Sequence, residues 1–213
     1  MDFPEPIVPK LKRSVAMTIA TLPATSTPIV HGRSFCNTRA MPPIVRHVAF
    51  LGGINVGGHR VTMTRLCHEV EQLGFVGVST FIASGNVCFD APSADTHADA
   101  LEVGLAAALG WPVPTFVRTA AEVVGAVDLL PFGIVPDGVT HMVVFCRTAP
   151  QRTVEGLSDD LELFEVHGRD VHWRIVGGVS DSRLTLPKLP KLLGQPCTSR
   201  NMKSLRKLGD LLR

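Results

Sequence analysis

HVAFLGGINVGGHRVTM, residues 47–63, is the stretch of this 213-residue chain that decides how its folded part begins. The apolar run at its start is typical of a short strand, and Thr62 near its end can cap a helix. Between these elements lie four glycines together with Asn55 and His59. Glycine permits positive φ angles and lets backbone N–H groups approach a ligand closely. The stretch therefore predicts a strand, a polar loop and a helix.

This loop fits neither of the common glycine-rich nucleotide-binding motifs. It lacks the G-x-G-x-x-G spacing, and no Lys-Ser or Lys-Thr pair follows its last glycine, which excludes a Rossmann fingerprint and a P-loop. A strand, a glycine-rich loop and a helix in this order can still bind an anion at the helix N-terminus. The alternative is a glycine-dense turn without a ligand, although a turn alone needs neither Asn55 nor His59.

The order of the elements predicts an α+β fold. After the helix that Thr62 caps, the first half continues with two strands within 78–90 that turn at Gly85-Asn86, a helix over 95–110, a strand over 113–118, and a helix that a capping box of Thr119 and Glu122 begins. This β-α-β-β-α-β order predicts a ferredoxin-like split βαβ N-terminal half.

A second α+β half is predicted to follow. Its elements are a strand over 141–147, a short helix within 153–161, a hairpin over 164–175 that turns at Gly168-Arg169, and two helical stretches over 182–194 and 198–213. The two halves are either related α+β units or parts of one continuous domain. The sequence shows no clear internal repeat that would decide between these alternatives.

The N-terminal segment differs from the rest in composition. Residues 1–45 are rich in Pro, Ser and Thr, which predicts a disordered extension. Residues 10–26 faintly resemble a secretory signal, but Thr and Pro interrupt their apolar part. The folded domain is expected over 46–213, with candidate subdomains over 46–135 and 136–213.

Composition and charge restrict the class of protein. A net charge of +2 excludes a strongly basic nucleic-acid-binding arm, but it leaves room for a local basic patch. No run of 18 apolar residues is present, so no membrane-spanning helix is expected. Five scattered cysteines without a C-x-x-C pair favour reduced thiols, and with them a cytoplasmic location, over a disulfide framework or a zinc site. Neither a metal nor another cofactor is expected.

Two other groups of residues have a chemical and a structural interpretation. The predicted hairpin places His167, His172, Glu165 and Asp170 on one face, and imidazole with carboxylate can bind zinc or iron. The apolar opposite face favours a simpler interpretation, in which these residues form the solvated side of an amphipathic hairpin. Cys197 precedes a predicted helix N-terminus, which can lower a thiol pKa, but a structural role is favoured here as well.

Several polar motifs in a fixed order give the chain a specific family resemblance. GGINVGGHRVTMTRLCHEVEQLGF (52–75) and TFIASGNVCF (80–89), with SDSRL and TSRNMKSLRKLGDLL near the C-terminus, strongly resemble the bacterial family known as domain of unknown function 1697, DUF1697. The resemblance runs from about Arg46 to the C-terminus. It implies an α+β fold with ferredoxin-like character, and it implies positions rather than a reaction.

The resemblance identifies the residues of a candidate ligand site. They are Asn55, Gly57 and Gly58 of the Gly-Ile-Asn-Val-Gly-Gly element, Ser84, Gly85 and Asn86 of Ser-Gly-Asn, and Thr198, Arg200 and Asn201 of Thr-x-Arg-Asn. The chain departs from the family at Gly52, where an Arg is typical, and at Met202, where an aromatic residue is usual. An anion site that relied on the missing Arg would here depend on Arg200 for its positive charge.

These side chains suit a small anionic ligand. Asn, Ser, Thr and Arg donors with exposed backbone N–H groups can bind phosphate or carboxylate where the loops cluster. We expect Asn55, Ser84, Asn86 and Arg200 to be the anion donors, with His59 as the one candidate general acid or base. No paired carboxylate or activated nucleophile supports catalysis, so enzyme activity is left open and no catalytic residue is assigned.

Two alternatives to the small ligand stay open. The sheet surface or the basic last helix could bind a nucleic acid or a protein, although an amphipathic helix has such a basic outer side in any case. The basic residues concerned are Arg200, Lys203, Arg206 and Lys207. In the second alternative the polar residues are structural only, so that Asn55 and Asn86 close turns, Thr198 caps a helix and Arg200 neutralises a neighbour.

Overall fold

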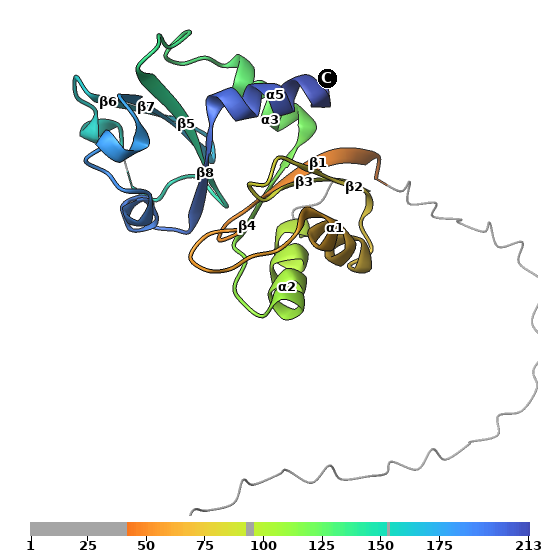
Figure 1. The fold of residues 1–213 in the computed structure, drawn as a ribbon. Coiled ribbons are helices and arrows are strands. Elements are labelled where there is room, and N and C mark those ends of the chain that lie inside the picture. Colours follow the sequence, from red (N-terminus) through yellow and green to blue (C-terminus); the bar gives the residue numbers. More distant parts are fainter. Residues whose placement is uncertain (1–41, 93–95, 153) are drawn as a thin grey trace, which may run out of the picture. The chain divides into compact units, whose positions relative to one another are not determined.

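Two antiparallel four-stranded sheets form the framework of the chain (Figure 1). The computed structural model describes residues 42–92, 96–152 and 154–213. In the first sheet the strand order is β2-β3-β1-β4, so β3 lies between the two strands that α1 connects. The elements of this half are β1 (Ile44–Leu51), α1 (Met63–Gln72), β2 (Val76–Phe81), β3 (Asn86–Pro92), α2 (His97–Leu109), β4 (Thr115–Thr119) and α3 (Ala120–Asp128).

The second sheet repeats the strand order of the first, because adding four to each strand number converts β2-β3-β1-β4 into β6-β7-β5-β8. The pairs of strands are again antiparallel. The elements of this half are β5 (Val139–Cys146), η1 (Glu155–Leu157), β6 (Glu162–His167), β7 (Asp170–Val176), η2 (Val179–Asp181), η3 (Leu186–Lys188), α4 (Leu189–Leu193), β8 (Cys197–Asn201) and α5 (Met202–Leu212). The repeat that the sequence did not show is therefore present in the topology.

Local signals at the helix ends are confirmed. Thr62 caps α1 by accepting a hydrogen bond from the N–H of Arg65 at 3.2 Å, and Thr119 with Glu122 forms the capping box that begins α3. These caps satisfy N–H groups that a helix leaves without partners in its first turn. Gly110 ends α2 in the left-handed conformation, with φ at +85°. The predicted α+β class is confirmed, while the ferredoxin-like relationship and the domain boundaries stay predictions.

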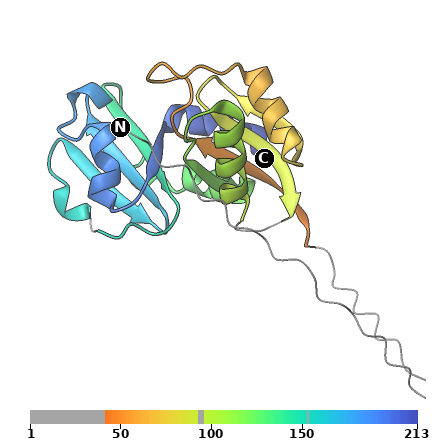
Figure 2. The ribbon, with the colours of Figure 1, turned by 90° about the horizontal axis from the view of Figure 1, so that it is seen from below.

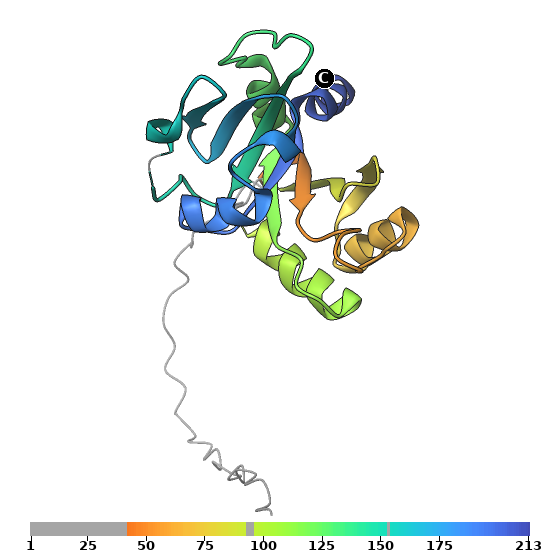
Figure 3. The same ribbon diagram turned by 60° about the vertical axis from the view of Figure 1, so that its left-hand side comes forward.

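The C-terminal segment corrects one of these predictions. A helix that begins at Thr198 is wrong, because residues 197–201 form strand β8, which pairs with β5 and places Arg200 opposite Val143. The helix α5 begins only after this strand, and Asn201 caps it by accepting from the N–H of Lys203 at 2.8 Å. The extended segment is favoured because it supplies hydrogen-bond partners to the edge of β5 that β7 leaves open. Figure 3 shows β8 leading directly into α5.

The two hairpins also differ in part from expectation. The second one turns at Gly168 as predicted, but the first one turns over residues 82–85, so that Asn86 is already the first residue of β3. The predicted solvated face of the second hairpin is confirmed for Glu165 and His167, but it is wrong for His172, which is fully buried, and for Asp170, which is 8% exposed. Residues of α3 lie beside both buried side chains. Within the described residues, no group of three or more His, Cys, Asp or Glu side chains is arranged to hold a metal ion.

Three clusters of buried apolar side chains hold these elements together. The first lies between the first sheet and helices α1 and α2, which are seen together in Figure 2, and another lies beneath α4. The central cluster joins the two halves, because Phe50 of β1 stacks on Phe145 of β5 with ring centroids 4.0 Å apart. Side chains of α3 and α5 complete this cluster. Residues 42–213 accordingly belong to one compact unit.

None of the helices in the described part of the chain is long and apolar enough to cross a lipid bilayer. The predicted disordered extension over 1–45 lies, as far as residue 41, outside the described residues, and it is wrong for Ile44 and Val45, which belong to β1.

Candidate functional site

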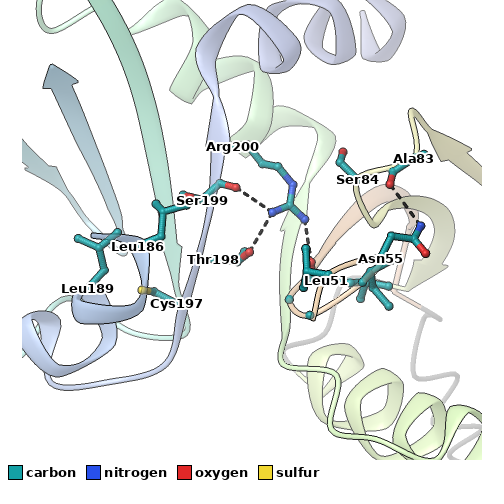
Figure 4. Close-up of a pocket in the computed structure, with 14 residues that line it drawn as sticks. Leu51, Asn55, Ala83, Ser84, Leu186, Leu189, Cys197, Thr198, Ser199 and Arg200 are labelled. Atoms are coloured by element: carbon teal, nitrogen blue, oxygen red, sulfur yellow. Dashed lines mark hydrogen bonds between the residues drawn. The ribbon is translucent and has the colours of Figure 1, made fainter. Parts of the chain in front are cut away.

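A pocket of about 500 Å³ lies where polar loops of the two halves meet (Figure 4). Four segments line it, namely the loop after β1, the turn between β2 and β3, the start of β8, and the segment of η3 and α4. Pockets for small molecules usually measure roughly 300–1,000 Å³. The polar side chains at this pocket are Asn55, Ser84, Thr198, Ser199 and Arg200, and Leu186 and Leu189 contribute an apolar wall.

Arg200 is held rigidly at this pocket and is only 8% exposed. A guanidinium has five N–H groups, and here each of them donates to a neutral oxygen. The acceptors are Asn86 Oδ1 at 2.6 Å from Nε, Thr198 Oγ1 and the Ser199 carbonyl at 2.9 and 2.8 Å from Nη1, and the Leu51 and Gly85 carbonyls at 2.9 and 3.3 Å from Nη2. The guanidinium carbon also lies 5.6 Å from the centroid of the Phe50 ring.

The positive charge of Arg200 has no ion-pair partner in the described part of the chain, although its hydrogen bonds are complete. Burial lowers the pKa of Arg200 to about 10, so the side chain is still protonated at neutral pH. A buried charge without a counter-ion is unfavourable, even when its hydrogen-bonding groups are satisfied. A negative charge in the adjoining pocket would therefore stabilise this arginine.

Asn86 presents an amide to Arg200 where a carboxylate would neutralise it. Its side chain is 1% exposed, and Nδ2 donates to the Phe81 carbonyl at 3.3 Å and to Ser84 Oγ at 2.8 Å, which closes the turn between β2 and β3. These two bonds direct Oδ1 toward Nε of Arg200. The amide thus satisfies one N–H of the arginine and leaves its charge unchanged.

Asn55 holds the loop after β1 against the same turn. Its Oδ1 accepts from the N–H of Val61 at 3.0 Å, and its Nδ2 donates to the Ala83 carbonyl at 3.4 Å. Along the loop φ is positive at Gly53, Asn55 and Gly57, and it is not positive at the residues between them. Backbone in which φ changes sign in this way can turn successive N–H groups into one concavity, which suits an anion.

A second buried arginine, Arg118 of β4, makes a matching set of contacts in the opposite direction. Arg200 reaches from the second half to the end of β1 and the start of β3, and Arg118 reaches from the first half to the end of β5 and the start of β7. Its backbone acceptors are the carbonyls of Val117 at 2.8 Å from Nη1 and of Cys146 and Arg169 at 2.8 and 3.3 Å from Nη2.

The side-chain partner of Arg118 is a carboxylate. Asp170 Oδ1 lies 3.1 Å from Nε and 2.5 Å from Nη2, and the arginine side chain is 1% exposed. Burial raises the pKa of the Asp170 carboxyl, and the hydrogen bonds and charge of Arg118 oppose this shift. Since both oxygens of Asp170 lie within hydrogen-bonding distance of the guanidinium, we treat the two side chains as an ion pair.

The structure brings some of the predicted site residues together and separates others. Asn55, Ser84, Thr198 and Arg200 line the pocket, while Gly85 and Asn86 bind Arg200. The remaining four lie elsewhere: Gly57 and Gly58 are exposed farther along the loop, His59 stacks on Trp111 with ring centroids 4.6 Å apart, and Asn201 caps α5. Thr198 lies within strand β8 and caps no helix.

Sequence reasoning missed most of the other residues that line the pocket, among them Ser199, Leu186 and Leu189. Ser199 could have been found only by recognising residues 197–201 as a strand. The two leucines are three residues apart, a spacing that places side chains on one side of a helical turn, and this signal was available. It does not show what the leucines face, because their neighbours are remote in sequence.

Two further groups bear on chemistry. Cys197 begins a strand instead of preceding a helix, and burial raises the pKa of its thiol to about 12, so it is not an activated nucleophile. His141 and His172 form a buried pair, with Nε2 and Nδ1 3.0 Å apart, and His172 borders a second hollow of about 330 Å³. Burial lowers their pKa values to about 4 and about 3, so both rings are neutral at pH 7.

Comparison with known proteins places the chain in a family. The model of the family described as protein of unknown function DUF1697 matches residues 44–172. The chain belongs to this family. The match confirms the predicted resemblance, and it ends before the Thr-x-Arg-Asn element that supplies Arg200. No curated protein matches this DUF1697 chain.

A solved structure with a similar fold is that of the conserved bacterial protein SP0830 from Streptococcus pneumoniae. It is 22% identical to this DUF1697 protein, with a TM-score of 0.58, and the similarity covers 80% of this chain and 99% of that one. At this identity the likeness supports the fold and carries no information on the ligand.

Proposed function

We propose that this protein binds a small ligand with a phosphate or carboxylate group in the pocket beside Arg200. The observation that carries the proposal is the buried guanidinium of Arg200, which has complete hydrogen bonds and no counter-ion among the described residues. An anion in the pocket would supply the missing negative charge. The interaction is strong at this place because burial reduces the screening of charge by water.

Hydroxyl groups of the pocket can supply the hydrogen bonds that Arg200 no longer offers. Ser84 Oγ accepts from Asn86, and Thr198 Oγ1 accepts from Arg200. A hydroxyl that accepts in this way keeps its own proton for another partner. Both residues can therefore donate to an anion that the charge of Arg200 attracts, and the backbone N–H groups of residues 53–55 lie in the adjoining loop.

The alternative use of α5 as a nucleic-acid or protein surface has less support. Lys203 and Lys207 are exposed on that helix, whereas Leu205 and Leu208 are buried in the central cluster. This is the arrangement expected of any amphipathic helix on a core. The alternative stays a prediction, and no catalytic role is assigned to the pocket.

Thermal unfolding of the full chain in the presence of anions tests the proposal. Inorganic phosphate and acetate, each titrated at constant ionic strength, should raise the melting temperature, since a ligand at 100 times its Kd adds about 2.7 kcal/mol to the free energy of unfolding. Thr198→Val removes the hydroxyl and keeps the side-chain shape. It should weaken binding roughly tenfold or more, because a hydrogen bond to a charged group contributes about 1.5–3 kcal/mol.

The matched control is Thr140→Val, which removes the hydroxyl of a β5 threonine that bonds the Gly177 carbonyl away from the pocket. This variant should be less stable but should respond to anions as the wild type does. An equal response from both variants, or no response from the wild type to either anion, would contradict the proposal.

A further inference from the structure

We propose that the ligand is a monocarboxylate with an apolar body and that Asn86 is the residue that sets this selectivity. The inference rests on the proposed anion binding and goes beyond it by naming the charge and the chemical class of the ligand. Three observations carry it: the matching arrangement of Arg118 and Arg200, the charge count of the pocket, and the position of its apolar wall.

The two arginines occupy equivalent places, as their acceptors show. Each donates from Nη1 to the carbonyl of the preceding residue, and both distances are 2.8 Å. Each donates from Nη2 to the last residue of the first strand in the other half, Cys146 or Leu51, at 2.8 and 2.9 Å. The guanidinium carbons lie over Phe145 and Phe50, which stack on each other. Because these contacts match, the group that neutralises Arg118 indicates what kind of group would neutralise Arg200.

The side chains that bond Nε of the two arginines differ by one functional group. The first residue of β7 is Asp170 and the first residue of β3 is Asn86, and each bonds Nε of its arginine. A single carboxylate, that of Asp170, thus neutralises Arg118. The amide of Asn86 leaves the other half short of one negative charge, which a ligand can supply.

The charge count of the pocket favours a singly charged ligand. Arg200 alone among the described lining residues carries a charge, and no Lys or second Arg joins it. A monocarboxylate balances this single charge. A pyrophosphate or a nucleoside triphosphate would bring further negative charges into a partly buried site without partners, which is unfavourable.

The apolar wall indicates the rest of the ligand. Leu186 and Leu189 lie on one side of Arg200 in Figure 4, whereas Ser84 and Asn55 lie on the other. Ile54 and Val56 of the loop after β1 add further apolar surface. A carboxylate near Arg200, Thr198 and Ser84 would leave its hydrocarbon part against these side chains, where burial of each methylene is favourable.

Isothermal titration of the full chain with acetate, butyrate, hexanoate, hexanol and pyrophosphate tests this inference. Affinity should rise from acetate to hexanoate by about fourfold for each buried methylene. Hexanol, which lacks the charge, and pyrophosphate, which has too many, should both bind at least tenfold more weakly than hexanoate. Tighter binding of pyrophosphate than of hexanoate would overturn the inference and leave the proposed anion binding in place.

Two variants test the role of charge at Arg200. Asn86→Asp places a carboxylate on Nε as Asp170 does for Arg118, and it should lower the affinity for hexanoate at least tenfold. Because Asp cannot donate to Phe81 and Ser84, this variant should be less stable than the wild type, and Thr198→Asp provides the same charge beside Nη1 without disturbing the turn. Its loss of affinity should exceed that of Thr198→Val.

Gln72→Glu is the control for net charge, since Gln72 is exposed at the end of α1 and is not one of the residues that line the pocket. It should bind hexanoate as the wild type does. Binding of hexanoate at wild-type affinity by a folded Asn86→Asp or Thr198→Asp variant overturns the assignment of Asn86. Failure of the wild type to bind any of the anions overturns the proposed function itself.

Discussion

Arg118 and Arg200 cross between the two halves in opposite directions, and they end in different electrostatic surroundings. Arg118 meets the carboxylate of Asp170, whereas Arg200 meets the amide of Asn86. The backbone acceptors are otherwise matched to within 0.1 Å at three of the contacts. The backbone framework that holds the two arginines is therefore the same, and the difference lies in their side-chain partners.

The surroundings of the two arginines differ as well. The strand that carries Arg118 has Phe116 and Val117 before the arginine, whereas the strand that carries Arg200 has Thr198 and Ser199 there. After β5 the chain continues with Arg147, which pairs with Asp99 and Glu102 of α2, whereas after β1 it continues with Gly52. Arg118 is thus surrounded by paired charges and by apolar side chains. Arg200 instead lies beside hydroxyl groups and a pocket and has no counter-ion among the described residues, and this is the arrangement in which we propose that an anion binds.

Removing the carboxylate from Arg118 should have the largest effect on stability. Asp170→Asn gives Arg118 the same amide partner that Arg200 has, and the charged residues that line the hollow beside position 170, Glu122 and Arg169, already pair with each other. Leaving a buried charge unpaired costs about 3–5 kcal/mol, so the free energy of unfolding in urea should fall by about that amount. Asp210→Asn, which breaks an exposed pair with Arg213, should cost less than about 1 kcal/mol. Equal costs for the two variants would show that Arg118 does not depend on its counter-ion.

Acid should reveal a second difference between the halves. The third residues of β5 and β7 are His141 and His172, which contact each other, and the third residues of β1 and β3 are Arg46 and Cys88. The pKa values of the two histidines are lowered to about 4 and about 3, so the unfolded chain binds more protons than the folded one below about pH 6.5. Stability should therefore be fully present above pH 6.5 and fall as pH decreases toward 4.

The expected loss is roughly 2–3 kcal/mol between pH 7 and pH 5.5, because over this range both histidines bind protons in the unfolded chain and neither does so in the folded chain. Urea unfolding at a series of pH values measures it. A double variant, His141→Leu with His172→Leu, should lose clearly less over the same range, and His68→Gln, at an exposed position on α1, should behave as the wild type. An unchanged pH dependence in the double variant would place the acid sensitivity elsewhere.

The sequence was informative wherever a signal acts over a few residues. The caps at Thr62 and Thr119, the glycine that ends α2 and the turn at Gly168 are all of this kind, and each is found where it was predicted. Strand β8 was missed because its residues run into the helical pattern of α5, and only pairing with β5, some 50 residues earlier in the chain, makes them extended. Local propensity cannot show such a partner.

The sequence indicated four of the polar residues that line the pocket, but it did not indicate the contacts that they make. The polar loops were expected to meet, and Asn55, Ser84, Thr198 and Arg200 do line one pocket. Asn86 was predicted to donate to a ligand, yet both of its N–H groups are used within the turn and its oxygen accepts from Arg200. That contact joins residues 114 apart in sequence, so no local pattern predicts that the arginine lacks a counter-ion.

Substitution of Gly52 tests whether the charge of the pocket determines which anion binds, and its effect on affinity should be smaller than the effects described above. Gly52 lines the pocket directly after β1, where Arg147 stands directly after β5. A side chain fits there, because φ is not positive and the nearest contact of an added Cβ, 3.4 Å to the Pro114 carbonyl oxygen, is ordinary. Gly52→Arg should bring a second positive charge to the pocket.

With two positive charges the pocket should favour a doubly charged anion. The affinity ratio of phosphate to acetate at pH 8, where phosphate is mainly a dianion, should rise about tenfold in Gly52→Arg, which corresponds to about 1.4 kcal/mol. Gly52→Ala adds bulk without charge and should leave the ratio unchanged. If the ratio in Gly52→Arg stays at the wild-type value while the variant still binds acetate, the charge at position 52 does not reach the bound anion. Selectivity would then depend on Arg200 and its amide partner alone, which would strengthen the contrast between Asn86 and Asp170.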